Sequence, residues 1–136
     1  MDVIVNDYLI SDNKDLLQID RVHSLLKSTY WADNREKETT RKSIDNSLCF
    51  GIYKDNIQVG FARCVTDYAT TYFLCDVVID NEHRGLGLGK ALIKLITEHN
   101  DLKSLSGNLK TKDAHGLYEQ YGFSRDKEAY MHKSAQ

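Results

Sequence analysis

The chain has 136 residues, of which 41% are hydrophobic and 28% are charged, so we expect one domain with a single core and no second domain. A formal net charge of -2 without a dense basic run argues against a nucleic-acid partner. No apolar run approaches the roughly 20 residues of a membrane span, and the N-terminus lacks the basic start of a leader, so we expect a cytoplasmic protein without a membrane partner.

The cysteines and histidines form no metal-binding or disulfide pattern. Cys49, Cys64 and Cys75 are widely spaced, and each lies within an apolar, strand-like run. Because a free cysteine behaves as a small buried hydrophobe, we predict three reduced core residues. The five histidines have no ligand spacing, so we expect no metal.

The first elements in chain order are a strand and two helices. Apolar residues between Val3 and Ile10 predict a strand that ends at Ser11-Asp12-Asn13, a polar cluster suited to capping a helix. Apolar residues then recur at three- and four-residue steps from about Asp15 to Lys27, which predicts an amphipathic helix. The segment from Arg35 to Asn46 is so polar that a helix there should be short and lie at the surface.

Three strands follow the second helix. The apolar runs from Leu48 to Tyr53 and from Ile57 to Thr66 are joined by Lys54-Asp55-Asn56, which predicts an antiparallel hairpin. The run from Thr71 to Ile79 should pair with its predecessor through a short turn. This third strand leads directly into a glycine-rich loop.

The loop from Arg84 to Lys90 is the most informative stretch, because it places three glycines in five residues before a segment with helical spacing. Free backbone N–H groups at a helix start attract phosphate, and glycine lets the ligand approach the main chain. A Walker loop is excluded, because Arg84 and Ala91 occupy positions where it needs Gly and Ser or Thr. The dinucleotide fingerprint G-x-G-x-x-G is excluded as well, because Lys90 and Leu92 stand where the third glycine is required.

The last third of the chain should hold one more strand, a short helix and a closing hairpin. The segment from Leu102 to Thr111 has weak strand propensity. Asp113 can cap a helix from Ala114 to Tyr121, and Gly122 can end it in the left-handed conformation. The residues from Phe123 to His132 leave room for a hairpin only.

Three segments resemble the GNAT family of N-acetyltransferases. Residues 84–89, Arg-Gly-Leu-Gly-Leu-Gly, match the acetyl-CoA pyrophosphate loop Q/R-x-x-G-x-G/A, and residues 117–123, Leu-Tyr-Glu-Gln-Tyr-Gly-Phe, resemble the segment L-Y-E-x-x-G-F that follows it in this family. Residues 76–79 look like its D-V-x-V strand. The order of elements also resembles this fold, so we expect residues 1–136 to form one α/β (α+β) domain of the acyl-CoA N-acyltransferase fold. Its mixed, twisted sheet would have six to seven strands flanked by four helices.

The resemblance implies that acetyl-CoA, the cosubstrate, lies in a V-shaped opening between the strand at Cys75 to Ile79 and the strand near Leu105 to Lys110. Main-chain groups of Val77 and Ile79 would pair with the pantetheine arm, and the loop N–H groups would receive the pyrophosphate. The expected cofactor-binding residues are Val77, Val78, Ile79, Arg84, Gly85, Leu86, Gly87, Leu88, Gly89, Lys90, Asp113, Gly116, Leu117 and Tyr118.

The family usually lets an amine attack the thioester directly in a ternary complex, and this requires an uncharged amine. A lysine-like amine with a pKa of about 10.4 must lose a proton at pH 7, which costs roughly 3.4 units or about 4.6 kcal/mol, so a general base is expected. Asp76 is the candidate, with Asp67 or His23 as alternatives, since Cys75 stands where many relatives have Glu. Strict alternation lets only one of Cys75 and Asp76 face the acceptor.

Tyr118 is the candidate general acid for the CoA thiolate, and the acceptor site is expected at Tyr30, Trp31, Asp67 and Tyr68. The acceptor would be a primary amine of a small molecule or a peptide, and a homodimer stays open. The alternative is a CoA-binding sensor or regulatory module with weak or no turnover, because Cys75 replaces the acidic residue. A nucleotide hydrolase is disfavoured by the loop spacing.

Overall fold

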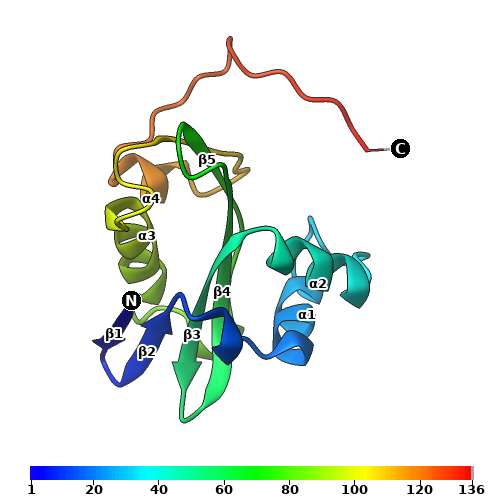
Figure 1. Cartoon of the computed structure of the whole chain (residues 1–136), viewed down its shortest axis with the longest axis vertical. Helices are drawn as coiled ribbons and strands as arrows, with labels where there is room; N and C mark the ends of the chain where they lie inside the picture. The colour runs from blue at the N-terminus through cyan, green and yellow to red at the C-terminus, as the bar shows by residue number, and fades with distance from the viewer. Residues whose placement is uncertain (136) are drawn as a thin grey trace.

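The computed structural model describes residues 1–135 and has a mixed sheet with helices on both faces (Figure 1). The strands are β1 (Asp2–Val5), β2 (Tyr8–Ser11), β3 (Leu48–Lys54), β4 (Ile57–Thr66), β5 (Thr71–Ile79) and β6 (Ser106–Leu109). The helices are α1 (Ile19–Lys27), α2 (Lys37–Asp45), α3 (Leu88–Glu98) and α4 (His115–Glu119), with short 3-10 turns η1 (Lys14–Leu16) and η2 (Asn81–His83). The predicted mixed sheet of six to seven strands with four helices is confirmed.

The six strands lie in the sheet in their sequence order. Every neighbouring pair is antiparallel except β5 and β6, which are parallel. A parallel pair needs a crossover, and the loop after β5 together with α3 supplies it. The glycine-rich loop therefore follows directly on β5, a member of the only parallel strand pair among the described strands.

Two apolar cores cover the two faces of the sheet. On the face of α3 and α4, Phe50 and Leu74 pack with Leu92 and Ile96 of α3. On the opposite face, α1 and α2 pack against Phe61 and Val78. Figure 1 shows these helix pairs on opposite sides of the strands. The spacing of apolar residues predicted an apolar face on these helices. Burial of this face holds the helices on the sheet.

The two ends of the chain differ from the predictions. The single first strand is wrong: it is a hairpin of β1 and β2, because Asn6 and Asp7 adopt φ of +47° and +67° and form a tight turn between them. The first helix begins at Ile19, since residues 14–16 form η1, where the Asn13 side chain accepts a bond from the Asp15 N–H at 3.0 Å.

The predicted closing hairpin is also wrong for the described residues, because no strand follows α4 up to residue 135. Figure 1 shows this segment, coloured orange to red, leaving α4 and running away from the body. The predicted cap of α4 is wrong too: the Thr111 hydroxyl, not Asp113, accepts a bond from the Ala114 N–H at 3.1 Å. Gly122 has the left-handed φ of +93° expected after a helix.

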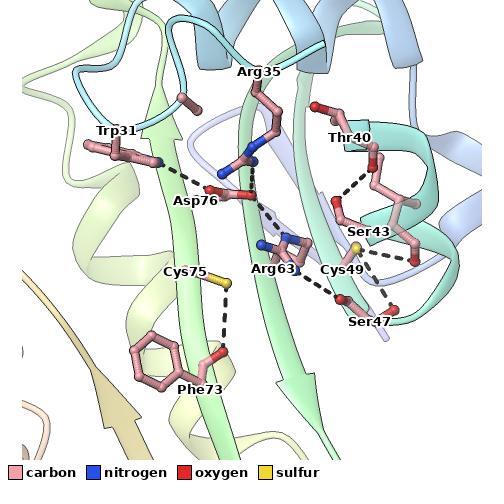
Figure 2. Close-up of polar contacts among 12 residues, drawn as sticks. Trp31, Arg35, Thr40, Ser43, Ser47, Cys49, Arg63, Phe73, Cys75 and Asp76 are labelled. Atoms are coloured by element: carbon pink, nitrogen blue, oxygen red, sulfur yellow. Dashed lines mark hydrogen bonds and ion pairs between the residues drawn. The ribbon is translucent and has the colours of Figure 1, made fainter. Parts of the chain in front are cut away.

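A β-bulge interrupts β5. Phe61 pairs with Val78 and Arg63 pairs with Cys75, so one residue of β4 opposes both Asp76 and Val77. Asp76 has a φ of +58°, which is unusual for a residue other than glycine. The prediction that Cys75 and Asp76 face opposite sides of the sheet is therefore wrong, and Figure 2 shows both side chains extending from β5 in the same direction.

Candidate active site

The sheet opens at the bulge. β6 pairs with β5 only over residues 71–74, so β5 has no strand partner on that side from Cys75 onward. The Asp80 N–H bonds to the Val59 carbonyl of β4 at 2.8 Å, so by alternation the main-chain groups of Ile79 and Val77 point to the open side. This edge is where the V-shaped opening was predicted.

A cleft of about 490 Å³ lies along this edge. Its walls are the link between α1 and α2, the end of β5 and the glycine loop. The lining residues are Ser28, Thr29, Tyr30, Trp31, Val77, Val78, Ile79, His83, Arg84, Gly85, Gly87, Leu88, Gly89 and Asp113. It brings together nine of the expected cofactor-binding residues with Tyr30 and Trp31 of the expected acceptor site.

The glycine loop leaves its main chain open to this cleft. Gly85 and Gly87 have φ of +79° and +80°, a conformation that costs other residues energy. Gly87 precedes α3, and no side chain among the described residues caps this helix start. The first intrahelical bond runs from the Ala91 N–H to the Gly87 carbonyl, so the N–H groups of Leu88 to Lys90 have no partner within the helix. A Cβ at any of the three loop glycines would meet no atom within 4 Å, which leaves space for a ligand against the backbone.

Arg84 lies beside the open edge of β5. Its Nε donates to the Ile79 carbonyl at 3.0 Å. The guanidinium thereby lies between the strand edge and the start of α3, where the helix dipole already favours an anion. The strand edge, the guanidinium and the helix start all border the first cleft, an arrangement whose chemistry suits an extended ligand that carries phosphate.

The opposite wall of the cleft is aromatic. Tyr30 and Trp31 pack edge to face with their ring centroids 5.0 Å apart. The ammonium group of Lys112 lies 5.1 Å from the centroid of Tyr30, which ties this link to the segment after β6. Trp31 also donates from Nε1 to Oδ1 of Asp76 at 3.1 Å, so the wall is fixed to the bulge.

Asp76 is held by three donors (Figure 2). Besides Trp31, Arg35 Nη1 lies 2.7 Å and Arg63 Nε lies 2.9 Å from Oδ2, and only 1% of the aspartate side chain is exposed. Burial acts to raise the pKa of Asp76, but the hydrogen bonds and charges of Arg35 and Arg63 outweigh it and hold this pKa below its usual value. The carboxylate therefore stays ionised, and both of its oxygens accept hydrogen bonds.

Arg35 and Arg63 were not predicted as part of the site. Arg63 lies within an otherwise apolar run of β4, and a charged residue in a buried strand needs a partner, which is a signal that the sequence offers. No comparable signal marks Arg35, since it lies in a polar segment 41 residues before Asp76. Their pairing with Asp76 depends on the tertiary fold.

Tyr118 lies in a second cleft, of about 520 Å³. This cleft is bounded by Phe73 of β5, by β6, by α4 and by residues 123–130. Tyr118 is buried and packs edge to face against Phe123 at 6.0 Å, and burial, followed by the nearby charge of Asp113, raises its pKa. Among the predicted cofactor residues, Leu86, Lys90, Gly116, Leu117 and Tyr118 do not line the first cleft.

Asp67 and Tyr68 lie in the turn between β4 and β5, and neither lines either cleft. The Asp67 carboxylate accepts bonds from the Thr70 hydroxyl and from the N–H groups of Ala69, Thr70 and Thr71. These bonds, that of the hydroxyl first, lower the pKa of Asp67. The carboxylate closes the turn, and its part in acceptor binding stays a prediction.

All three cysteines are free, and Cys49 and Cys64 are core residues as predicted, but the prediction of a core residue is wrong for Cys75, which is half-buried. Burial raises the pKa of Cys75 to about 11, so its thiol is protonated near neutral pH. Within residues 1–135, no group of three or more His, Cys, Asp or Glu side chains is placed to hold a metal ion. In the same part of the chain, no helix has the length and apolar character to cross a membrane.

Comparison with known proteins identifies similar domains. The model of the acetyltransferase (GNAT) domain matches residues 45–125. A crystal structure from Xanthomonas campestris pv. campestris, assigned to the GNAT family, is 40% identical with a TM-score of 0.89, and the match covers 94% of this chain and 93% of that one. An acetyltransferase-type protein of Clostridium acetobutylicum crystallised with acetyl-CoA is 13% identical with a TM-score of 0.67 over 93% and 94% of the two chains, which shows a shared fold.

Curated sequences agree with this result. A protein of Gibberella zeae assigned as an acetyltransferase is 30% identical in an alignment 112 residues long that covers 68% of this chain and 63% of that protein. The chain spans 63%, 42% and 46% of the length of the relatives from Gibberella zeae, Arabidopsis thaliana and Prochlorococcus marinus.

Proposed function

Because the chain belongs to the GNAT acetyltransferase family, we propose that it moves the acetyl group of acetyl-CoA to a primary amine by direct attack in a ternary complex. One observation carries the proposal: the unpaired edge of β5 runs into a loop whose free N–H groups open into the same cleft. An extended donor with a pyrophosphate at one end needs this combination of strand edge and helix start.

The residues of the first cleft fit acetyl-CoA. Val77 offers its outward-pointing N–H and carbonyl to the pantetheine amides, and Ile79 offers its N–H, since its carbonyl already accepts a bond from Arg84 Nε. The N–H groups from Gly85 to Lys90 and the guanidinium of Arg84 offer donors to its pyrophosphate. When bound, acetyl-CoA supplies a thioester carbonyl as the electrophile.

The role that we propose for Asp76 is to position the acceptor wall. A base must accept a proton, and both carboxylate oxygens of Asp76 already accept bonds from Trp31, Arg35 and Arg63. Its lowered pKa makes proton transfer from an ammonium group still less favourable. We propose that Asp76 keeps Trp31 in place and that the amine loses its proton to water in the open cleft before it attacks.

Tyr118 stays our candidate for the general acid. Its raised pKa keeps the phenol protonated, so it can donate to a departing thiolate. It stands on the β6 side of the opening, while Trp31 stands on the β5 side. Donor and acceptor would then meet between the two clefts.

A CoA-binding sensor with weak or no turnover is the second candidate. One observation favours it: the carboxylate of Asp76 is bonded to three donors. It also agrees with the family resemblance, which would place an acidic residue at Cys75. Such a module would bind CoA through the same loop and strand edge without acetylating an amine.

The deciding experiment measures acetyl-CoA-dependent thiol release against a panel of metabolite and peptide amines. Release that depends on a particular amine, together with a mass increase of one acetyl group in the product, supports the transferase. A CoA-induced rise in melting temperature without release against any amine supports the sensor. A rise in melting temperature with ATP but not with CoA would contradict both.

A further inference from the structure

The Asp76 cluster carries more positive than negative charge. Arg35 and Arg63 both donate to the same carboxylate oxygen, at 2.7 Å and 2.9 Å. Asp76 is the only carboxylate paired with either guanidinium among the ion pairs of residues 1–135. The nearby thiols of Cys75 and Cys49 add no negative charge, because burial raises their pKa values to about 11 and about 12. The cluster therefore has a net charge of about +1 at neutral pH.

This charge lies largely out of water. The side chains of Arg35 and Arg63 are 22% and 14% exposed. A charge removed from water is costly unless an opposite charge or hydrogen bonds compensate it. The two guanidinium groups share one carboxylate, so one positive charge is left without an opposite charge. The cluster therefore favours the binding of an anion.

The two guanidinium groups keep donors for such an anion. Arg35 uses one nitrogen for Asp76, and Arg63 uses one for Asp76 and one for Ser47 Oγ at 3.2 Å. Among residues 1–135, the side-chain nitrogen and oxygen atoms sealed from solvent without a partner belong only to Thr40 and Tyr53. The remaining nitrogens of both arginines are therefore reachable from outside.

The cluster lies behind the aromatic wall of the first cleft, although Arg35 and Arg63 do not themselves line that cleft. Asp76 forms the bulge at which β5 leaves β6, and it bonds to Trp31, which lines the first cleft. Figure 2 shows Arg35, from the link between α1 and α2, and Arg63, from β4, converging on this carboxylate. One aspartate thus separates the aromatic wall of the cleft from both cations.

We propose that the amine acceptor carries an anionic group, a carboxylate or a phosphate, which binds to the free donors of Arg35 and Arg63. Guanidinium groups suit these planar or multidentate oxyanions through paired hydrogen bonds. The inference rests on the proposed transferase function, since it describes the acceptor of that reaction. It selects amino acids and amine phosphates over neutral amines.

Two matched acceptor pairs test the proposal and distinguish the two anions. Tyrosine is compared with tyramine for the carboxylate, and O-phosphoethanolamine with ethanolamine for the phosphate. Values of kcat/KM, corrected for the fraction of neutral amine, should be at least tenfold higher for the anionic member of one pair. This preference should weaken as salt is added. Equal values within both pairs, or a preference for the neutral members, would overturn the proposal.

Variants assign the preference to a residue. Arg35→Gln should bring the ratio within the preferred pair close to one, mainly through KM for the anionic member, and Arg35→Lys should restore part of it. Arg41→Gln is the matched control, because Arg41 is an exposed residue paired with Glu38 on α2, and it should keep the wild-type ratio. Melting curves identify any variant that fails to fold. A ratio that persists in folded Arg35→Gln would exclude the arginine as its source.

Binding distinguishes this inference from the proposed function. Calorimetric titration of the four amines into the complex with CoA requires no turnover. If CoA binds and no amine is acetylated, tighter binding of the anionic member still supports the anion site, and equal binding contradicts it. If CoA itself fails to bind, the proposed function is wrong, and titration of inorganic phosphate into wild type and Arg35→Gln decides whether the anion site exists.

Discussion

Replacement of Asp76 by asparagine tests the charge arrangement beneath the cleft. The change keeps the size of the side chain and removes its negative charge. Arg35 and Arg63, at 2.7 Å and 2.9 Å from Oδ2, would then lose their shared counter-charge in a place where the side chain at position 76 is 1% exposed. We expect a large loss of stability.

Removal of one partner from a buried ion pair costs about 3–5 kcal/mol, because the other charge stays buried and unpaired. The asparagine oxygen can still accept one hydrogen bond, so we expect a loss of about 3 kcal/mol. For a domain of this size, at about 3 °C per kcal/mol, the melting temperature should fall by about 10 °C.

Urea denaturation at neutral pH measures this loss. Far-UV circular dichroism follows the whole fold, while fluorescence of Trp31, the one tryptophan of the chain, reports on the network itself. The slope of free energy against urea should stay constant, so that the change lies in the midpoint. Glu38→Gln is the control: it breaks an exposed pair with Arg41 and should leave the midpoint almost unchanged.

The effect has a defined dependence on pH. The pKa of Asp76 is lower in the folded protein than in the unfolded chain. Its stabilisation is therefore fully present above the unfolded value of about 3.9 and is lost as the pH falls through the folded value. The difference between wild type and Asp76→Asn should close in strong acid. A difference below about 0.5 kcal/mol at neutral pH, or one that grows in acid, would refute the charge argument, since 0.5 kcal/mol is the range of surface substitutions.

The other predictions concern the cleft and the chemistry. Gly87→Ala should lower the free energy of unfolding in urea by about 1–2 kcal/mol, because position 87 has a left-handed backbone, whereas Gly89→Ala should not lower it. Calorimetry should show weaker CoA binding in both variants, because a Cβ would enter the open space beside the loop. Tyr118→Phe should lower kcat about 100-fold with little change in KM for acetyl-CoA, and an unchanged kcat would exclude the phenol as the acid. Cys75→Ala should retain activity, and iodoacetamide should label this thiol slowly at pH 7, since burial keeps it protonated. Without a protein base, kcat/KM for an alkylamine should rise about tenfold per pH unit between about pH 6 and 8, and a plateau in that range would reveal a base.

Local patterns predicted the middle of the fold well. The bounds of β4 and β5 agree with the prediction, because long apolar, β-branched runs between polar turns leave little choice of structure. The helical spacing predicted after the glycine-rich loop is also confirmed by α3, which begins at Leu88 and includes Gly89, the last of the three glycines. At the N-terminus, Asn6 and Asp7 are turn-forming residues, but the apolar residues on both sides hid the break between β1 and β2.

The candidate site was predicted only where it consists of consecutive residues. The loop and the edge of β5 are local features, so spacing identified the loop, and the resemblance to the family placed both in one opening. The contacts of Asp76 join residues 13, 41 and 45 positions apart, and no local pattern encodes such pairings. The second cleft escaped prediction for the same reason, since it depends on how residues 123–130 pass over β6.

The bulge in β5 affects both the stability of the domain and the access of a ligand to the edge of this strand. Without it, strict alternation would place Asp76 on the same face as Tyr72 and Leu74, within the apolar core that packs against α3. The extra residue instead turns the carboxylate toward Arg63 and returns Val77 and Ile79 to the α3 side. The same irregularity stands where pairing with β6 ends, so the strand edge becomes free for a ligand. A change that straightened β5 would therefore move the carboxylate into this apolar core and close the free strand edge in one step.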